Sequence, residues 1–540
     1  MKKRNILQAF GFLLCLIFAF LYISCGKSPR YLKLIPADAS FVIAINTTNI
    51  ATKVVSWTDL FNSDLFKGFG NGEAKDKSSK VKDAGIDFLQ TAYLFGNANM
   101  SDKSKNYVAV LFQLSDEAKF EQFAKNLDNK NSFRIETNEG VKYAISKEIV
   151  ASWKDKTAII LSNLKKFNEE QSVALLKALR NTEEKNSLVN QNKQFADLQK
   201  ESYDISFWLN LSDFNKLLKE GSREVPALGI FDLNMNNSYI TSTLNFEKGK
   251  VIARTQYHCP AEIYQEMEKL FKKDMSATLI ENLPVAKPLF WVSAGLDMKY
   301  IKEGLKSTGF DNMIDKQANT MLGLSLAQVL DIFTGEIALA GKEIKMGEET
   351  VSTINPETGE MDGYTVKKPT MNIVLALGVR NSKNIEKILK ELSQGDMRLF
   401  QKREGVYVTP ISANQNLYVI SKDKVVYLTN EESIKNSIQK DDKKERIDTK
   451  IAALAKNSYF AWWIDMQEQN KVPNELLDEY GIPQTNPIES IGLISKPLKN
   501  NIIAFEGTLT LKNKSQNSLR TLLEFSKTLS KTDKKPKVLQ

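Results

Sequence analysis

Alternating apolar and amphipathic stretches in the first half of the chain predict strands and helices in a definite order. Apolar runs bounded by polar residues are typical of strands, and apolar residues three or four positions apart are typical of one helix face. The predicted elements are a strand at 40–46, a helix at about 48–66, strands at 91–96 and 106–114, a helix at 116–127, and hairpin strands up to about residue 162. This order predicts an α+β domain with a mostly antiparallel sheet and helices on one face.

The same plan recurs in the second half of the chain. Four pairs of segments match in the same order: Tyr107–Leu114 with Asn372–Val379, Glu139–Val141 with Glu404–Val406, Trp153–Leu161 with Ser421–Leu428, and Ser206–Asn210 with Ala461–Asp465. Similarity that keeps one order over several elements indicates an internal repeat. We therefore predict a tandem duplication, with a first α+β repeat domain at 34–275 and a second at 282–532.

Polar segments between these elements predict loops and helix caps. Residues 68–82 and 347–368 are predicted as exposed loops, and the second contains turn signals at Asn355–Gly359 and Asp362–Gly363. Asn, Asp, Ser and Thr residues directly after apolar strands are expected to cap helices, because their side chains accept hydrogen bonds from free helix N–H groups.

Three tryptophans lie within predicted strands. Trp208 and Trp463 occupy matching positions in the two halves, and Trp291 lies in a related strand. A sugar-stacking surface is the alternative to core packing for such residues. We predict core packing, since a position repeated inside an apolar strand is what a buried sheet requires.

The N-terminal residues have the pattern of a bacterial lipoprotein signal. Three positive residues at 2–4 precede an apolar run, and a small residue comes directly before Cys25. We predict a signal peptide at 1–24, lipidation of Cys25 after cleavage, and a tether at 25–33. The alternative is an uncleaved membrane anchor, because the apolar run at 6–23 is nearly long enough to span a bilayer.

Length and charge limit the class of protein further. A chain of 540 residues exceeds what one hydrophobic core normally organises, so at least two domains are expected. The formal charge is +9, and removal of the three positive signal residues leaves 9 − 3 = +6. Basic and acidic residues are interspersed rather than gathered into a stripe, so no nucleic-acid partner is expected. The basic tail at 533–540 is predicted to be a solvated terminus.

Cysteine and histidine are too scarce for most metal or nucleophile chemistry. Cys15 lies in the predicted signal and Cys25 is the lipid site, so Cys259 is the one thiol left for the mature chain, beside the single histidine, His258. A zinc site needs about four ligands, usually His or Cys. We expect no catalytic residue, no cofactor and no metal here, and the enzyme question stays open with a binding protein favoured.

Other motifs are weak. Asp232, Asn234 and Asn236 resemble the first ligands of a calcium loop, but Asn237 replaces the turn glycine, so a plain turn is predicted. The Ser-x-x-Lys pair at 79–82 has no accompanying motif. A pair of catalytic carboxylates of the glycosidase type is not singled out by the sequence.

The mature chain resembles a family of Bacteroidetes lipoproteins catalogued as domain of unknown function 4836. The resemblance rests on Cys25, the opening Ile35–Val42 and the segment Leu330–Ala338. It implies a periplasm-facing or surface lipoprotein and brings no activity or site residues. Gly26–Arg30 lacks the acidic residues typical of surface lipoproteins, which favours the periplasmic face of the outer membrane.

These observations leave three functional classes. The first is a non-enzymatic envelope protein, held on the membrane through lipid on Cys25, that binds a protein partner or takes part in assembly. The second is a binder of a small ligand, glycan or lipid between the two lobes. The third is a carboxylate-based hydrolase.

Overall fold

The structure is a computed structural model of the whole chain. It describes residues 30–53, 84–98, 106–125, 134–146, 149–163, 168–214, 235–271, 277–307, 310–354, 361–394, 399–412, 415–456, 458–468, 471–479 and 486–529. These residues fall into two compact units. Unit 1 contains residues up to 263 together with 500–504 and 510–533, and unit 2 contains 264–499 and 505–509.

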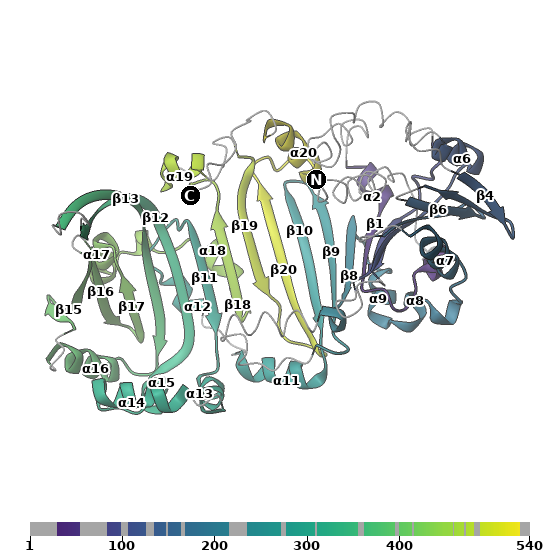
Figure 1. Cartoon of the computed structure of the whole chain (residues 1–540). Coiled ribbons are helices and arrows are strands. Elements are labelled where there is room, and N and C mark those ends of the chain that lie inside the picture. Colours follow the sequence, from purple (N-terminus) through teal and green to yellow (C-terminus); the bar gives the residue numbers. More distant parts are fainter. Residues whose placement is uncertain are drawn as a thin grey trace. The chain divides into compact units, whose positions relative to one another are not determined.

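Unit 1 is built on an antiparallel sheet (Figure 1). Its elements are β1 (Phe41–Ile45), α2 (Thr47–Ala51), β2 (Ala92–Asn97), β3 (Tyr107–Gln113), α6 (Glu117–Lys125), β4 (Arg134–Asn138), β5 (Val141–Ile145), β6 (Ile149–Lys154), β7 (Thr157–Asn163), α7 (Glu169–Arg180), α8 (Leu188–Gln191), α9 (Lys193–Leu198), β8 (Ile205–Asn210), β9 (Tyr239–Glu247), β10 (Lys250–His258) and, from the end of the chain, α20 (Ser518–Leu529). The strand order is β4-β5-β6-β7-β3-β2-β1-β8-β9-β10.

Unit 2 is also built on an antiparallel sheet. Its elements are α11 (Ala261–Leu270, shared at its start with unit 1), α12 (Ala277–Glu281), β11 (Phe290–Gly295), α13 (Met298–Ser307), α14 (Phe310–Leu322), α15 (Leu326–Leu330), β12 (Phe333–Ile354), β13 (Met361–Val379), α16 (Ser382–Gln394), β14 (Gln401–Arg403), β15 (Val406–Ser412), β16 (Gln415–Lys422), β17 (Val425–Thr429), α17 (Glu432–Lys440), α18 (Thr449–Leu454), β18 (Phe460–Asp465), α19 (Asn474–Glu479) and β19 (Ile488–Ser495). β20 (Ile502–Leu511) pairs with β19 and has residues in both units.

The predicted α+β class with a mostly antiparallel sheet is therefore confirmed. The strands predicted at 40–46, 91–96 and 106–114 correspond to β1, β2 and β3, and the helix predicted at 116–127 corresponds to α6. The helix predicted at 48–66 begins as α2, and its remainder and the predicted loop at 68–82 lie largely or wholly outside the described residues.

The order of strands in unit 2 repeats that of unit 1. It runs β14-β15-β16-β17-β13-β12-β11-β18-β19-β20, so each strand has a counterpart with the same neighbours. That the two halves arose by duplication of one domain stays a prediction, and this shared topology supports it.

Two local features also recur at matching places. Two-residue hairpin turns of type I′ need left-handed backbone at both positions. The matching turns have it: φ is 51° and 57° at Asp155 and Lys156, and 49° and 63° at Asp423 and Lys424. In addition, Phe41 lies opposite Gly96, and Phe290 lies opposite Gly341. A Cβ at either glycine would come within 3.0 Å of the opposite ring, so each ring fills the space above a strand glycine.

The prediction that helices cover one face of the sheet is wrong. In unit 1, Ala109 of β3 belongs to a core cluster with Leu176 of α7. The next residue, Val110, belongs to a second cluster with Phe120 of α6 and Leu523 of α20. Neighbouring residues in a strand point to opposite faces, so helices pack on both. The sequence already contains the reason for this packing. All residues of β3 from Tyr107 to Phe112 are buried, and a strand that is apolar at every position needs cover on both faces.

The prediction of an exposed loop at 347–368 is also wrong. β12 pairs with β11 as far as Gly341, and β13 pairs with β17 from Val374 onward. Beyond those points residues 343–354 and 361–372 pair with each other as a long two-stranded ribbon (Figure 1). Its exposed residues, such as Lys367 and Lys368, give no apolar alternation, and the sequence therefore lacks the usual strand signal.

Candidate functional site

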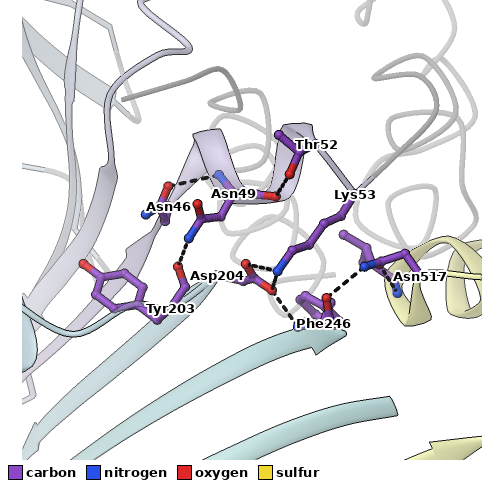
Figure 2. Close-up of polar contacts among 9 residues, drawn as sticks. Asn46, Asn49, Thr52, Lys53, Tyr203, Asp204, Phe246 and Asn517 are labelled. Atoms are coloured by element: carbon purple, nitrogen blue, oxygen red, sulfur yellow. Dashed lines mark hydrogen bonds and ion pairs between the residues drawn. The ribbon is translucent and has the colours of Figure 1, made fainter. Parts of the chain in front are cut away.

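Unit 1 contains a buried ion pair where four elements meet (Figure 2). Lys53, just after α2, donates to both carboxylate oxygens of Asp204 at 2.6 Å. Asp204 is fully buried and precedes β8, and the backbone N–H of Phe246 in β9 donates to its Oδ2 at 2.6 Å. Asn517, at the start of α20, donates from Nδ2 to the carbonyl of Phe246 at 2.9 Å.

Hydrogen bonds from Asn46 and Asn49 to the backbone complete this cluster. Asn46 caps α2, because its Oδ1 accepts from the N–H of Asn49 at 3.1 Å. The backbone N–H of Asn46 donates to the carbonyl of Asp204, and Asn49 Nδ2 donates to the carbonyl of Tyr203, both at 2.8 Å. Each Asp204 oxygen thus has a donor within the protein. The arrangement joins α2, β8, β9 and α20, and we assign it a structural role.

Unit 2 contains the candidate binding site, a cavity of about 270 Å³. It lies beside the start of β12, the ends of β13 and β16, and the C-terminal end of α17. Its polar lining residues are Asn282, Thr334, Glu336, Lys422, Asp423, Lys424, Tyr427, Ser437, Asp441, Asp442 and Arg446. Glu336 is 8% exposed, and it is one of two buried carboxylates among the described residues, with Asp204 of unit 1.

The charges at the cavity are partly paired with each other. Arg446 donates to Asp441 Oδ1 at 2.7 Å, and Lys422 donates to the carbonyl of Ile438 at 2.8 Å. The hydrogen bond from Arg446, followed by the charge of Lys422, lowers the pKa of Asp441. Burial raises the pKa of Tyr427 to about 12, so this phenol keeps its proton at neutral pH.

The matching corner of unit 1 is filled. Arg180, the last residue of α7, donates to Ser152 Oγ at 2.9 Å and to the carbonyls of Ser152 and Thr157 at 2.6 and 2.5 Å. By the correspondence of the two hairpins, Thr157 of unit 1 is the counterpart of Val425 of unit 2, which lines the cavity. The helix in unit 2, α17, ends at Lys440 with a left-handed cap at Asp441, and the corner there is open.

The predicted lipidation site, Cys25, lies outside the described residues. The other candidate thiol is in unit 1. Cys259 is buried, its Sγ lies 3.6 Å from the carbonyl of Asn501, and burial raises its pKa to about 11. His258 Nε2 lies 2.9 Å from Thr241 Oγ1, and burial lowers its pKa. A thiol that stays protonated is a weak nucleophile. We therefore assign His258 and Cys259, which lie at and directly after the end of β10, a structural role.

We expect the double variant His258→Ala/Cys259→Ser to keep its biological activity. The reason is that neither side chain contacts a group suited to metal binding or nucleophile activation in the described part of the chain. Loss of the buried thiol should cost at most about 3 kcal/mol. Complementation of a deletion strain is the measurement, with protein level checked by immunoblot. Loss of complementation at normal protein level would show that this is a thiol- or histidine-dependent protein.

The tryptophan prediction is confirmed. Trp208 and Trp291 are 1% and 0% exposed, and Trp463 is 9% exposed. Phe195 packs edge-on against Trp208 with ring centroids 5.9 Å apart. These rings are core residues and offer no surface for sugar stacking.

Metal-binding motifs and membrane-spanning helices are absent from the residues that the structure describes. No group of three or more His, Cys, Asp or Glu side chains in those ranges is placed to hold a metal ion. Of the calcium-like segment, Asn236 and Asn237 are described, and Asn237 has a φ of 55° in a turn before β9. Residues 79–82 are not described. No helix within the described ranges has both the length and the apolar character to cross a membrane.

Comparison with known proteins identifies the family. An antiparallel α+β chain with these features matches the family model described as "Domain of unknown function (DUF4836)" over residues 31–519. The chain belongs to this family. A comparison with curated proteins found no match.

Solved structures of TP0453 are similar to part of the chain. The structure of crystal form IV is 10% identical, covers 43% of this chain and 81% of its own, and has a TM-score of 0.26. The structure of crystal form III is 9% identical, covers 47% of this chain and 91% of its own, and has a TM-score of 0.27.

Proposed function

We propose that this chain is a lipid-anchored cell-envelope protein at the periplasmic face of the outer membrane, where it binds a protein partner or takes part in assembly. One observation carries the proposal: positive residues at 2–4, an apolar run, and a small residue directly before Cys25. The occupied hydrogen-bond sites of Asp204 and the raised pKa of Cys259 make these two groups poor catalysts, so the proposal assigns them no chemistry.

Replacement of the acyl acceptor tests the anchor. In Cys25→Ser the thiol that accepts the lipid is gone, so we expect labelling by a palmitate analogue to disappear completely and the signal to remain uncleaved. Metabolic labelling followed by gel analysis gives the answer, and Cys259→Ser is the matched control that should label as the unaltered chain does. Equal labelling of Cys25→Ser and the unaltered chain would refute lipidation.

A second candidate function is the binding of a small ligand, and the cavity of unit 2 favours it. At about 270 Å³ it lies near the lower end of known ligand pockets. The corresponding place among the described residues of unit 1 holds no such cavity, because the Arg180 side chain occupies it and donates to the carbonyls of Ser152 and Thr157. The partner-binding function and this one are compatible within one protein.

A further inference from the structure

The two-stranded ribbon of unit 2, formed by residues 343–354 of β12 and 361–372 of β13, has two outer edges (Figure 1). Neighbouring residues of a strand direct their backbone N–H and C=O groups to opposite sides, so every second residue of each strand faces away from the other strand. An outer edge with free backbone groups is a template for another strand. The contacts at each edge therefore decide where the ribbon can pair further.

The outer edge of β13 is blocked. Asn430, which follows β17, accepts at Oδ1 from the N–H of Ile373 at 2.9 Å and donates from Nδ2 to the carbonyl of Met371 at 2.8 Å. Residues 371 and 373 therefore face away from β12, and by the same alternation so do residues 367 and 369. Pro369 has no N–H to offer at its outward position, and Lys367 is an exposed lysine of the kind that protects strand edges.

The outer edge of β12 is open. Asn372 of β13 faces β12 and lies opposite Glu343, so Glu343 faces β13 and the next residue faces outward. The backbone groups of these outward residues have no hydrogen-bond partner in the described ranges, where pairing with β11 ends at Gly341. The segment 343–354 contains no proline. The outward residues are Ile344, Met346, Glu348, Thr350, Ser352 and Ile354.

The side chains beside this edge form an apolar face. Ile344 lies opposite Met371, and Met346 lies opposite Pro369, so these four side chains are on one face of the ribbon. Met371 is 37% exposed, and Pro369 is exposed as well. A second ribbon placed edge to edge with the first would continue this apolar face across the junction.

The charges beside this edge are balanced. Lys345 pairs with Glu343 at 2.9 Å, and Glu348 lies opposite Lys367. Two identical edges therefore meet without a surplus of one sign, and like charges would otherwise oppose their association.

We propose that two copies of this chain pair through the outer edge of β12, antiparallel and about a twofold axis, and so join their ribbons into one continuous sheet. A twofold axis brings the same edge of both copies together, and this closes the assembly at two chains. The blocked edge of β13 prevents further growth by strand pairing. The inference rests on the partner-binding role proposed above and names a second copy as the partner.

Sedimentation velocity of the full mature chain in detergent tests the pairing. We expect a dimer that dissociates to a monomer on dilution. Residue-resolved hydrogen exchange supplies a readout that needs no variant. The outward amides of Ile344, Met346 and Glu348 should exchange at least about tenfold more slowly in the dimer than in the monomer, whereas those of Lys345 and Gly347, which face β13, should be protected in both.

Substitutions at one outward position locate the interface. Met346→Pro removes an outward N–H and keeps the bonds to β13, so we expect dimer affinity to fall at least about tenfold, because the twofold axis loses the bond twice. Met346→Lys leaves the backbone as it is and adds a positive charge to each copy at the shared edge, so it should weaken the dimer too. Thr365→Pro is the matched control, because Thr365 faces outward at the blocked edge of β13 and its loss should leave the dimer unchanged.

The outcomes separate this inference from the function beneath it. A monomer at every concentration, a dimer that neither Met346 variant weakens, or outward amides that exchange equally fast in dimer and monomer would each overturn the pairing. The partner-binding role would then fall to a protein other than a second copy. Absence of palmitate labelling in a chain that still dimerises would instead refute the lipid anchor and leave the pairing.

Discussion

A chain that ends at residue 516 should lose the stable fold of unit 1 while unit 2 keeps its own. The truncation removes Asn517 and α20, although β20 and Gln516 remain. Leu523 of α20 is 4% exposed in the core cluster that contains Phe120 and Trp153. Removal of one buried leucine side chain costs about 2–5 kcal/mol, and a domain has only about 5–15 kcal/mol in total.

The loss is expected to exceed about 5 kcal/mol, since the truncation also uncovers the core beneath the helix and removes the contact between Asn517 and Phe246. Hydrogen exchange with mass spectrometry measures each unit separately. Peptides from β3 and α6 should exchange at rates of an unfolded chain, and peptides from β13 and α17 should stay protected. The control chain lacks only 533–540 and should behave as the full chain does. Full protection of β3 in the chain ending at 516 would show that α20 is dispensable.

Loss of the charge of Lys53 should be the most damaging single substitution near the ion pair of unit 1. Lys53→Met leaves the fully buried carboxylate of Asp204 with the N–H of Phe246 as its remaining donor from this cluster. Removal of one partner from a buried pair costs about 3–5 kcal/mol. Asp204→Asn should cost less, about 1–3 kcal/mol, because the Lys53 side chain is 24% exposed and water can solvate its charge.

A double-mutant cycle isolates the interaction. Lys53→Met/Asp204→Asn should be more stable than the sum of the single losses implies, since the two residues contact each other. Native-state hydrogen exchange in unit 1 is the suitable measurement, because two units need not unfold in one step. Asp197→Asn, which breaks the exposed pair with Lys200, is the control and should leave exchange unchanged. Additive losses would show that the pair does not stabilise the fold.

The local elements could be predicted from the sequence because their signals are local. The run from Tyr107 to Leu114 is apolar throughout, and the spacing of Phe120 and Phe123 marks a helix face. The hairpin turns at Asp155–Lys156 and Asp423–Lys424 recur with the same residues and the same left-handed backbone. The topology that these elements share in the two units follows the order of the repeated segments.

The features that were missed depend on contacts between distant residues. The packing of helices on both faces was implied by the fully apolar β3, although sequence alone did not indicate which helix covers which face. The pairing of Lys53 with Asp204 joins residues 151 positions apart. The cavity brings Glu336 together with Ser437 and Arg446, and of these three only Glu336 lies in a segment that the sequence singled out, Leu330–Ala338. Gly378, a glycine inside an apolar strand, is a further signal that could have drawn attention to that corner.

The return of residues 510–533 to unit 1 has a consequence for how the protein is made. A chain grows from its N-terminus at about 5–20 residues per second, so the 523 − 263 = 260 residues between the end of the first segment and Leu523 take about 13–50 s. Throughout that interval the apolar side of β3 and α6 lacks the helix that covers it. Unit 1 therefore completes its core only after the rest of the chain has been made, and until then its uncovered apolar side is open to aggregation.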